Sequence, residues 1–152
     1  MWQASHRSVL RMWSDVFGVA PTRPAHREAM LRLAMLLSRG KKPEEAIGIV
    51  RKLREKNPED VELMLFLGAL LEEAKRYEEA LAVVTEATEK APENPAAWFS
   101  LGVVQDKLGK LDQVIAAMEK VIALDPKHAT ALNYLGYTFA DRNMRLADAE
   151  KL

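Results

Sequence analysis

The side chains able to catalyse a reaction or to bind a metal are scattered along this chain. Its three histidines, His6, His26 and His128, lie far apart, and none belongs to a metal-binding motif such as HExxH. The sequence has no cysteine, which excludes thiol nucleophiles, thiolate zinc sites and disulfides. Its seven glycines form neither a phosphate-binding loop nor a nucleophile elbow. We therefore predict that the protein is not an enzyme and has no catalytic residue, metal site or cofactor.

Charge is balanced over the whole chain but unevenly distributed along it. The 152 residues include 22 basic and 22 acidic side chains, so the formal net charge is zero. Residues 1–60 carry a net charge of +5, residues 61–94 carry −5, and residues 95–152 balance. A basic end beside an acidic segment would orient a dipolar partner or favour head-to-tail contact between copies. Ordinary solvated helix surfaces produce the same pattern.

The most basic stretch lacks the features of a nucleic-acid-binding surface. It contains Arg32, Arg39, Lys41, Lys42, Arg51, Lys52 and Arg54. Glu44, Glu45 and Glu55 lie within or next to this stretch and reduce its net positive charge. No aromatic side chains are interleaved with it for base stacking. No segment approaches the roughly 18 apolar residues of a membrane-spanning helix. We expect no nucleic-acid partner, no direct membrane span and a soluble protein.

The elements that position these side chains follow a repeat. Pro58, Pro92 and Pro126 are each separated by 34 residues. This period divides the chain into units at 27–60, 61–94 and 95–128, with an incomplete fourth unit at 129–152.

Each unit contains the pattern of two amphipathic helices. In the first half a leucine is followed by a small residue, at Leu33-Ala34, Leu67-Gly68, Leu101-Gly102 and Leu135-Gly136. Bulky apolar residues lie three positions before each leucine, and a second column, reading Leu37, Leu71, Gln105 and Phe139, lies four positions after it. Spacings of three and four put these residues on one helical face. The small residue would let the second helix of the unit approach closely.

Residues 27–152 resemble the tetratricopeptide repeat family. The segments "LFLGALLEEAKRYEEALAVVTEATEKAPEN" and "WFSLGVVQDKLGKLDQVIAAMEKVIALDP" carry its Leu-Gly pattern, its apolar column in the second helix and its closing proline. The resemblance implies an all-α fold, a right-handed α-solenoid of antiparallel helix pairs. Gln105, Val114 and Val121 depart from the residue types usual in the family.

The two ends of the chain differ from full repeats. We expect residues 1–26 to form an N-terminal capping helix or a degenerate half-repeat, with Val9, Trp13 and Phe17 on one face. The fourth unit stops early in its expected second helix, which leaves its first helix partly uncovered. We interpret this end as that of a fragment of a longer protein, and expect the open end to favour homo-oligomers.

In this family the first helices of the repeats line a concave groove. The matching positions here are Leu31, Met35, Leu65, Ala69, Phe99, Val103, Asn133 and Tyr137. A mostly acidic rim flanks them at Glu62, Glu72, Glu73, Asp106, Lys107 and Asp141. The carboxylate-clamp members place lysine and asparagine where this chain has Leu31 and Met35, so we predict no clamp. The groove instead favours an apolar or amphipathic segment, with Phe99 and Tyr137 as anchors, unless these side chains pack within the superhelix.

The sequence therefore predicts a scaffold that binds a peptide or helix of another protein in its groove. One alternative is a self-assembly module, and another is a regulatory fragment of a larger enzyme or of an envelope or secretion protein. The last unit, "NYLGYTFADRNMRLADAEKL", is similar to terminal repeats of bacterial members. This similarity indicates a bacterial source, and it leaves both the cytoplasm and the periplasm open as the compartment.

Overall fold

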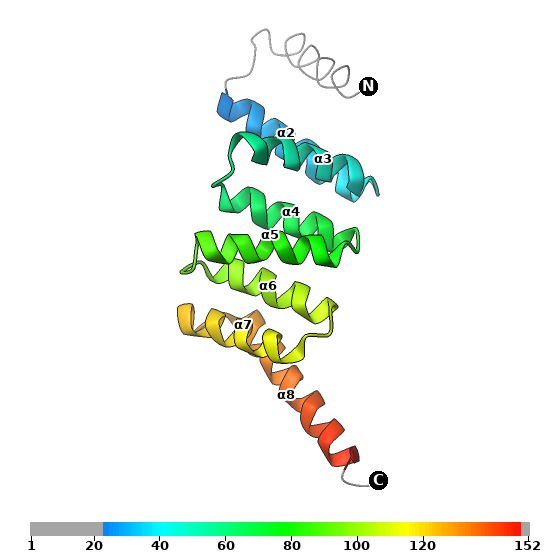
Figure 1. The fold of residues 1–152 in the computed structure, drawn as a ribbon, viewed down its shortest axis with the longest axis vertical. Coiled ribbons are helices and arrows are strands. Elements are labelled where there is room, and N and C mark those ends of the chain that lie inside the picture. The colour runs from blue at the N-terminus through cyan, green and yellow to red at the C-terminus, as the bar shows by residue number, and fades with distance from the viewer. Residues whose placement is uncertain (1–22, 150–152) are drawn as a thin grey trace. The chain divides into compact units, whose positions relative to one another are not determined.

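The computed structural model describes residues 23–149, and over this range the chain consists of helices and the turns between them (Figure 1). The helices are α2 (Arg23–Arg39), α3 (Pro43–Lys56), α4 (Val61–Glu73), α5 (Tyr77–Lys90), α6 (Pro95–Lys107), α7 (Leu111–Leu124) and α8 (Ala129–Ala149). The predicted capping segment, residues 1–26, lies largely outside the described residues. The chain forms two compact units, residues 1–53 and 54–152, and each is described by itself.

The first unit contains α2 and most of α3. Pro43 opens α3 in its first turn, where its missing N–H costs no hydrogen bond. Glu44 and Glu45 follow it in that turn and interact favourably with the positive end of the helix dipole. The buried side chains of this unit are Met30, Ala34, Ala46, Ile47, Ile49, Val50 and Leu53.

The second unit contains α4 to α8, in which each helix packs against the next one along the chain. The N-terminus of α4 is capped by Asp60, whose carboxylate accepts a hydrogen bond from the Leu63 amide at 3.2 Å. Asn94 caps α6 by accepting from the Ala96 amide at 2.9 Å, and Pro95 follows it at the first helical position. α4 also contacts α6, so the first helices of these two pairs lie side by side.

The first helices of three pairs end in the same backbone geometry. Lys41, Lys75 and Gly109 are 34 residues apart and have φ angles of 59°, 60° and 69°. The residue after each donates its amide to a carbonyl five residues earlier, as in the bond of 2.8 Å from Arg76 to Leu71. This is the Schellman arrangement, which ends a helix with one left-handed residue. Glycine is the residue usual at this position, as at Gly109, whereas lysine does not mark a helix end in the sequence.

The small residue that follows the leucine in the first helix of a unit allows close packing against the second helix. A Cβ atom added to Gly68 would lie 2.5 Å from Cγ1 of Val84 on α5, and one added to Gly102 would lie 2.5 Å from Cε of Met118 on α7. The glycines therefore let α4 contact α5, and α6 contact α7, at close range. Gly136 has no such neighbour within 4 Å among the described residues.

The fourth unit differs from the expectation of two helices. α8 continues without a break from Ala129 to Ala149. Asn143 occupies the position that matches Lys41, Lys75 and Gly109, yet it lies inside α8. Neither glycine nor proline occurs between residues 137 and 149 to stop the helix. Leu132 and Phe139 are exposed on this helix.

The departures from the family pattern have different consequences in the core. Val114 and Val121 are fully buried with Met118 and Ala131, so the larger side chains are accommodated. Gln105 is also buried, and its side-chain Oε1 accepts no hydrogen bond from the described part of the chain. This oxygen is therefore a buried acceptor without a partner among the described residues.

Candidate functional site

The second unit has an apolar cavity between α4 and α6, which we call the α4–α6 cavity. Its volume is about 180 Å³, and its lining residues are Gly68, Ala69, Glu72, Val84, Phe99, Ser100, Val103 and Val104. Ala69, Phe99 and Val103 are three of the groove residues predicted from the sequence. The structure brings these three together.

The walls of the α4–α6 cavity are held by the core beneath them. Phe99 and Val103 lie one turn apart on α6 and pack against the buried cluster of Val114, Met118, Val121 and Ala131. The Phe99 ring also lies 5.2 Å from the ring of His128, measured between centroids. Because both side chains pack against the core, their orientations are fixed before a ligand binds. Ala69 is exposed on α4 and leaves the cavity open to solvent.

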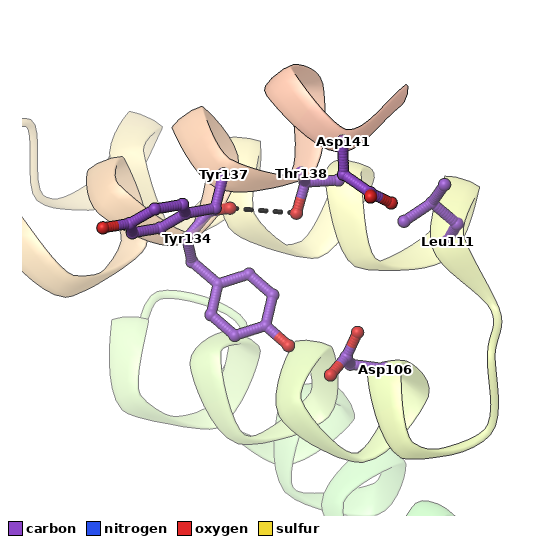
Figure 2. Close-up of a pocket in the computed structure, with 6 residues that line it drawn as sticks. All are labelled: Asp106, Leu111, Tyr134, Tyr137, Thr138 and Asp141. Carbon is purple, nitrogen blue, oxygen red and sulfur yellow. Dashed lines mark hydrogen bonds between the residues drawn. The ribbon is translucent and has the colours of Figure 1, made fainter. Parts of the chain in front are cut away.

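A second cavity, the α6–α8 cavity, lies between α6 and α8 (Figure 2). Its volume is about 300 Å³, and its lining residues are Asp106, Leu111, Tyr134, Tyr137, Thr138 and Asp141. Tyr137 is 79% exposed and presents an aromatic ring to solvent. This cavity therefore combines two carboxylates from different helices with two aromatic rings.

Hydrogen bonds orient the polar side chains that line the α6–α8 cavity. The Tyr134 hydroxyl points toward the Asp106 carboxylate in Figure 2, and burial together with the hydrogen bond to Asp106 raises the pKa of Tyr134 above its ordinary range. Tyr134 therefore stays protonated at neutral pH and donates to Asp106. The Thr138 hydroxyl donates to the Tyr134 carbonyl oxygen at 2.9 Å, one turn earlier on α8.

The other predicted groove residues lie in three different settings. Leu65 packs against the buried cluster of Met64, Ala87 and Ala97, so it belongs largely to the core. Asn133 is exposed on α8, while Tyr137 lines the α6–α8 cavity. Leu31 and Met35 lie on α2 in the first unit, where Leu31 is half-buried and Met35 is 46% exposed.

Three residues that line the α6–α8 cavity, Leu111, Tyr134 and Thr138, were not predicted from the sequence, whereas Asp106 and Asp141 were predicted as part of an acidic rim. A signal was present, because Tyr134, Tyr137, Thr138 and Asp141 are spaced by three and four and so share one face of α8.

Within residues 23–149, no helix is long and apolar enough to cross a bilayer. The same part of the chain contains no group of three or more carboxylate and histidine side chains arranged to hold a metal ion.

Comparison with known proteins agrees with the repeat pattern. The family model of the tetratricopeptide repeat matches residues 36–102 and 71–135, which together make up more than half of the chain. The chain belongs to the tetratricopeptide repeat family. None of the curated proteins is significantly similar to it.

Solved structures share the fold of this tetratricopeptide repeat protein. MamA from Desulfovibrio magneticus RS-1 has 25% identity and a TM-score of 0.68, with 81% of this chain and 70% of that chain covered. The first tetratricopeptide repeat domain of Spaghetti, bound to the HSP90 peptide SRMEEVD, has 19% identity and a TM-score of 0.69, with 76% and 91% covered.

A third similar structure is YrrB, described as a tetratricopeptide repeat protein with an unusual peptide-binding site. It has 23% identity and a TM-score of 0.65, and the match covers 70% of this chain and 55% of that chain. These structures and the helices described above confirm the predicted fold class, an all-α tetratricopeptide repeat fold.

Proposed function

We propose that this protein is a non-enzymatic scaffold that binds a segment of another protein in the groove formed by the first helices of the second unit, α4, α6 and α8. The observation that carries the proposal is the α4–α6 cavity, where Ala69, Phe99 and Val103 meet at an opening of about 180 Å³. An apolar side chain of the partner fits this opening, because the lining is mainly apolar and is fixed from behind by the core.

Two of the similar structures support peptide binding as the activity of this fold. The Spaghetti domain binds the HSP90 peptide SRMEEVD, and YrrB is described by its peptide-binding site. In this chain Leu31 and Met35 replace the polar residues of a carboxylate clamp, so the partner differs from an acidic C-terminal tail. We propose an apolar or amphipathic internal segment instead, and retain the repeat boundaries 27–60, 61–94, 95–128 and 129–152 as part of this proposal.

A matched pair of variants tests the proposal. Ala69→Gln adds a neutral side chain at the mouth of the α4–α6 cavity, whereas Ala82→Gln adds the same side chain at an exposed position of α5 outside it. Partners captured from a lysate of the source cells would be identified, and the affinity of each purified segment for both variants measured by calorimetry. We expect at least about tenfold weaker binding to Ala69→Gln and unchanged binding to Ala82→Gln. Equal binding to the two variants would contradict the groove.

Self-assembly is a second candidate function, favoured by the exposed apolar side chains of α8. Leu132, Tyr137 and Phe139 are all exposed on this helix, and large exposed apolar side chains often mark a contact surface. The test is the mass measured by light scattering over a range of concentrations. A dimer or larger species that reverts to monomer in a Leu132→Gln, Phe139→Gln variant would support self-assembly, and a monomer at all concentrations would exclude it.

A further inference from the structure

We infer that the α6–α8 cavity binds the guanidinium group of an arginine in the same partner segment that places an apolar side chain in the α4–α6 cavity. This inference rests on the proposed function and adds the chemistry of the partner. It follows from the composition of the second cavity and from the register of the two cavities along α6.

The composition of the α6–α8 cavity matches an arginine side chain. Asp106 and Asp141 contribute carboxylates from α6 and α8, and a planar guanidinium donates up to five hydrogen bonds to such acceptors. Tyr137 adds an exposed ring on which a guanidinium stacks. Leu111, at the start of α7, offers apolar surface for the methylene stem.

The hydroxyl of Tyr134 strengthens this assignment. It remains protonated and donates to Asp106, so it orients that carboxylate without removing its negative charge. None of the six lining residues is basic. The lysine next to Asp106 in the sequence, Lys107, has its ammonium 3.9 Å from the Glu72 carboxylate on α4. Asp106 and Asp141 carry the only formal charges among the six lining residues, and carboxylates complement a cation.

The two cavities share one face of α6. Phe99 and Val103 line the α4–α6 cavity, and Asp106 lines the α6–α8 cavity. Spacings of four and three keep these residues on one side of the helix, and seven residues of α-helix rise by about 10 Å. An extended peptide covers about 10 Å in three residues. Test peptides with the arginine three positions from the apolar residue match this axial separation of Phe99 and Asp106.

Four short peptides test this register directly. They are acetylated and amidated Leu-Ala-Ala-Arg and Arg-Ala-Ala-Leu, and the same two peptides with citrulline in place of arginine. Citrulline keeps the shape of arginine but is uncharged. In NMR titrations of the isotope-labelled protein, we expect one arginine peptide to shift the amide signals of Ala69, Val103, Thr138 and Asp141. Its citrulline form should bind about tenfold more weakly.

Charge-matched variants identify the cavity responsible. Asp106→Asn with Asp141→Asn removes two carboxylates from the cavity, and Glu89→Gln with Glu119→Gln removes two exposed carboxylates outside its lining. The preference for arginine over citrulline should disappear in the first double variant and persist in the second. If the first variant loses its helical circular dichroism, Tyr137→Ser replaces it, and should reduce the preference at least threefold.

The outcomes separate this inference from the proposed function. Equal affinity of the wild type for arginine and citrulline peptides would overturn the arginine site, as would the absence of binding by all four peptides at millimolar concentrations. An arginine preference that survives in both the Asp106→Asn, Asp141→Asn variant and the Tyr137→Ser variant would also overturn it. In each case, the proposed function would still hold if Ala69→Gln, but not Ala82→Gln, weakened the binding of a captured partner.

Discussion

At the scale of single residues, Gln105 is a polar side chain at a buried position of a repeat column that is otherwise apolar in the sequence. It is 8% exposed, and the matching positions in the two preceding units are Leu37 and Leu71. A buried acceptor without a partner costs about 1–3 kcal/mol. We predict that Gln105→Leu raises the free energy of unfolding by about 1 kcal/mol. Urea denaturation measures this change, with Gln113→Leu, at an exposed position of α7, as the control that should show little change.

Two glycines at equivalent positions should respond in opposite directions to the same change. Gly68→Ala puts a methyl group against the stiff, branched side chain of Val84, and overpacking of this kind costs about 1–3 kcal/mol. Gly136→Ala meets no described atom within 4 Å and should gain about 0.5–1 kcal/mol from better helix propensity. Thermal unfolding of both variants checks the pair. A stabilised Gly68→Ala would contradict the close approach of α4 and α5.

At the scale of the elements, the ends of the first helices depend on one left-handed residue each. Lys75 has φ of 60°, a conformation that costs a residue with a Cβ atom about 1–2 kcal/mol relative to glycine. We predict that Lys75→Gly stabilises the protein by about 1 kcal/mol, whereas Lys75→Ala, which keeps the Cβ atom, does not. Denaturant unfolding distinguishes the two. Equal stability of both variants would show that the strain at this turn is small.

The same turns explain which elements were predictable from the sequence. Glycine at position 109 is the residue type typical of such a helix end, whereas Lys41 and Lys75 adopt the same geometry, with the same closing hydrogen bonds, without that signal. At Asn143 no described helix packs back, and α8 continues past it to Ala149. The expectation of a second helix in the last unit rested on the repeat period alone. The period carries no information on whether a following helix packs against the first.

At the scale of the whole molecule, the repeat period and its apolar columns were sufficient to predict the all-α tetratricopeptide fold. They predicted the binding site less completely, since Ala69, Phe99 and Val103 line one cavity while Leu65 belongs largely to the core. The repeat columns name the residues that face the groove, but not how far each side chain is covered by its neighbours. The α6–α8 cavity was not predicted from the sequence, because it depends on how α6 and α8 approach each other around Asp106 and Tyr134.

We propose that a partner segment lies along α4, α6 and α8. Hydrogen–deuterium exchange of the protein with and without a captured partner segment shows which helices the segment covers. We predict added protection in α4, α6 and α8, near Ala69, Val103 and Thr138, and little change in α5 and α7. Protection concentrated in α5 and α7, with none added to α4 and α6, would contradict it.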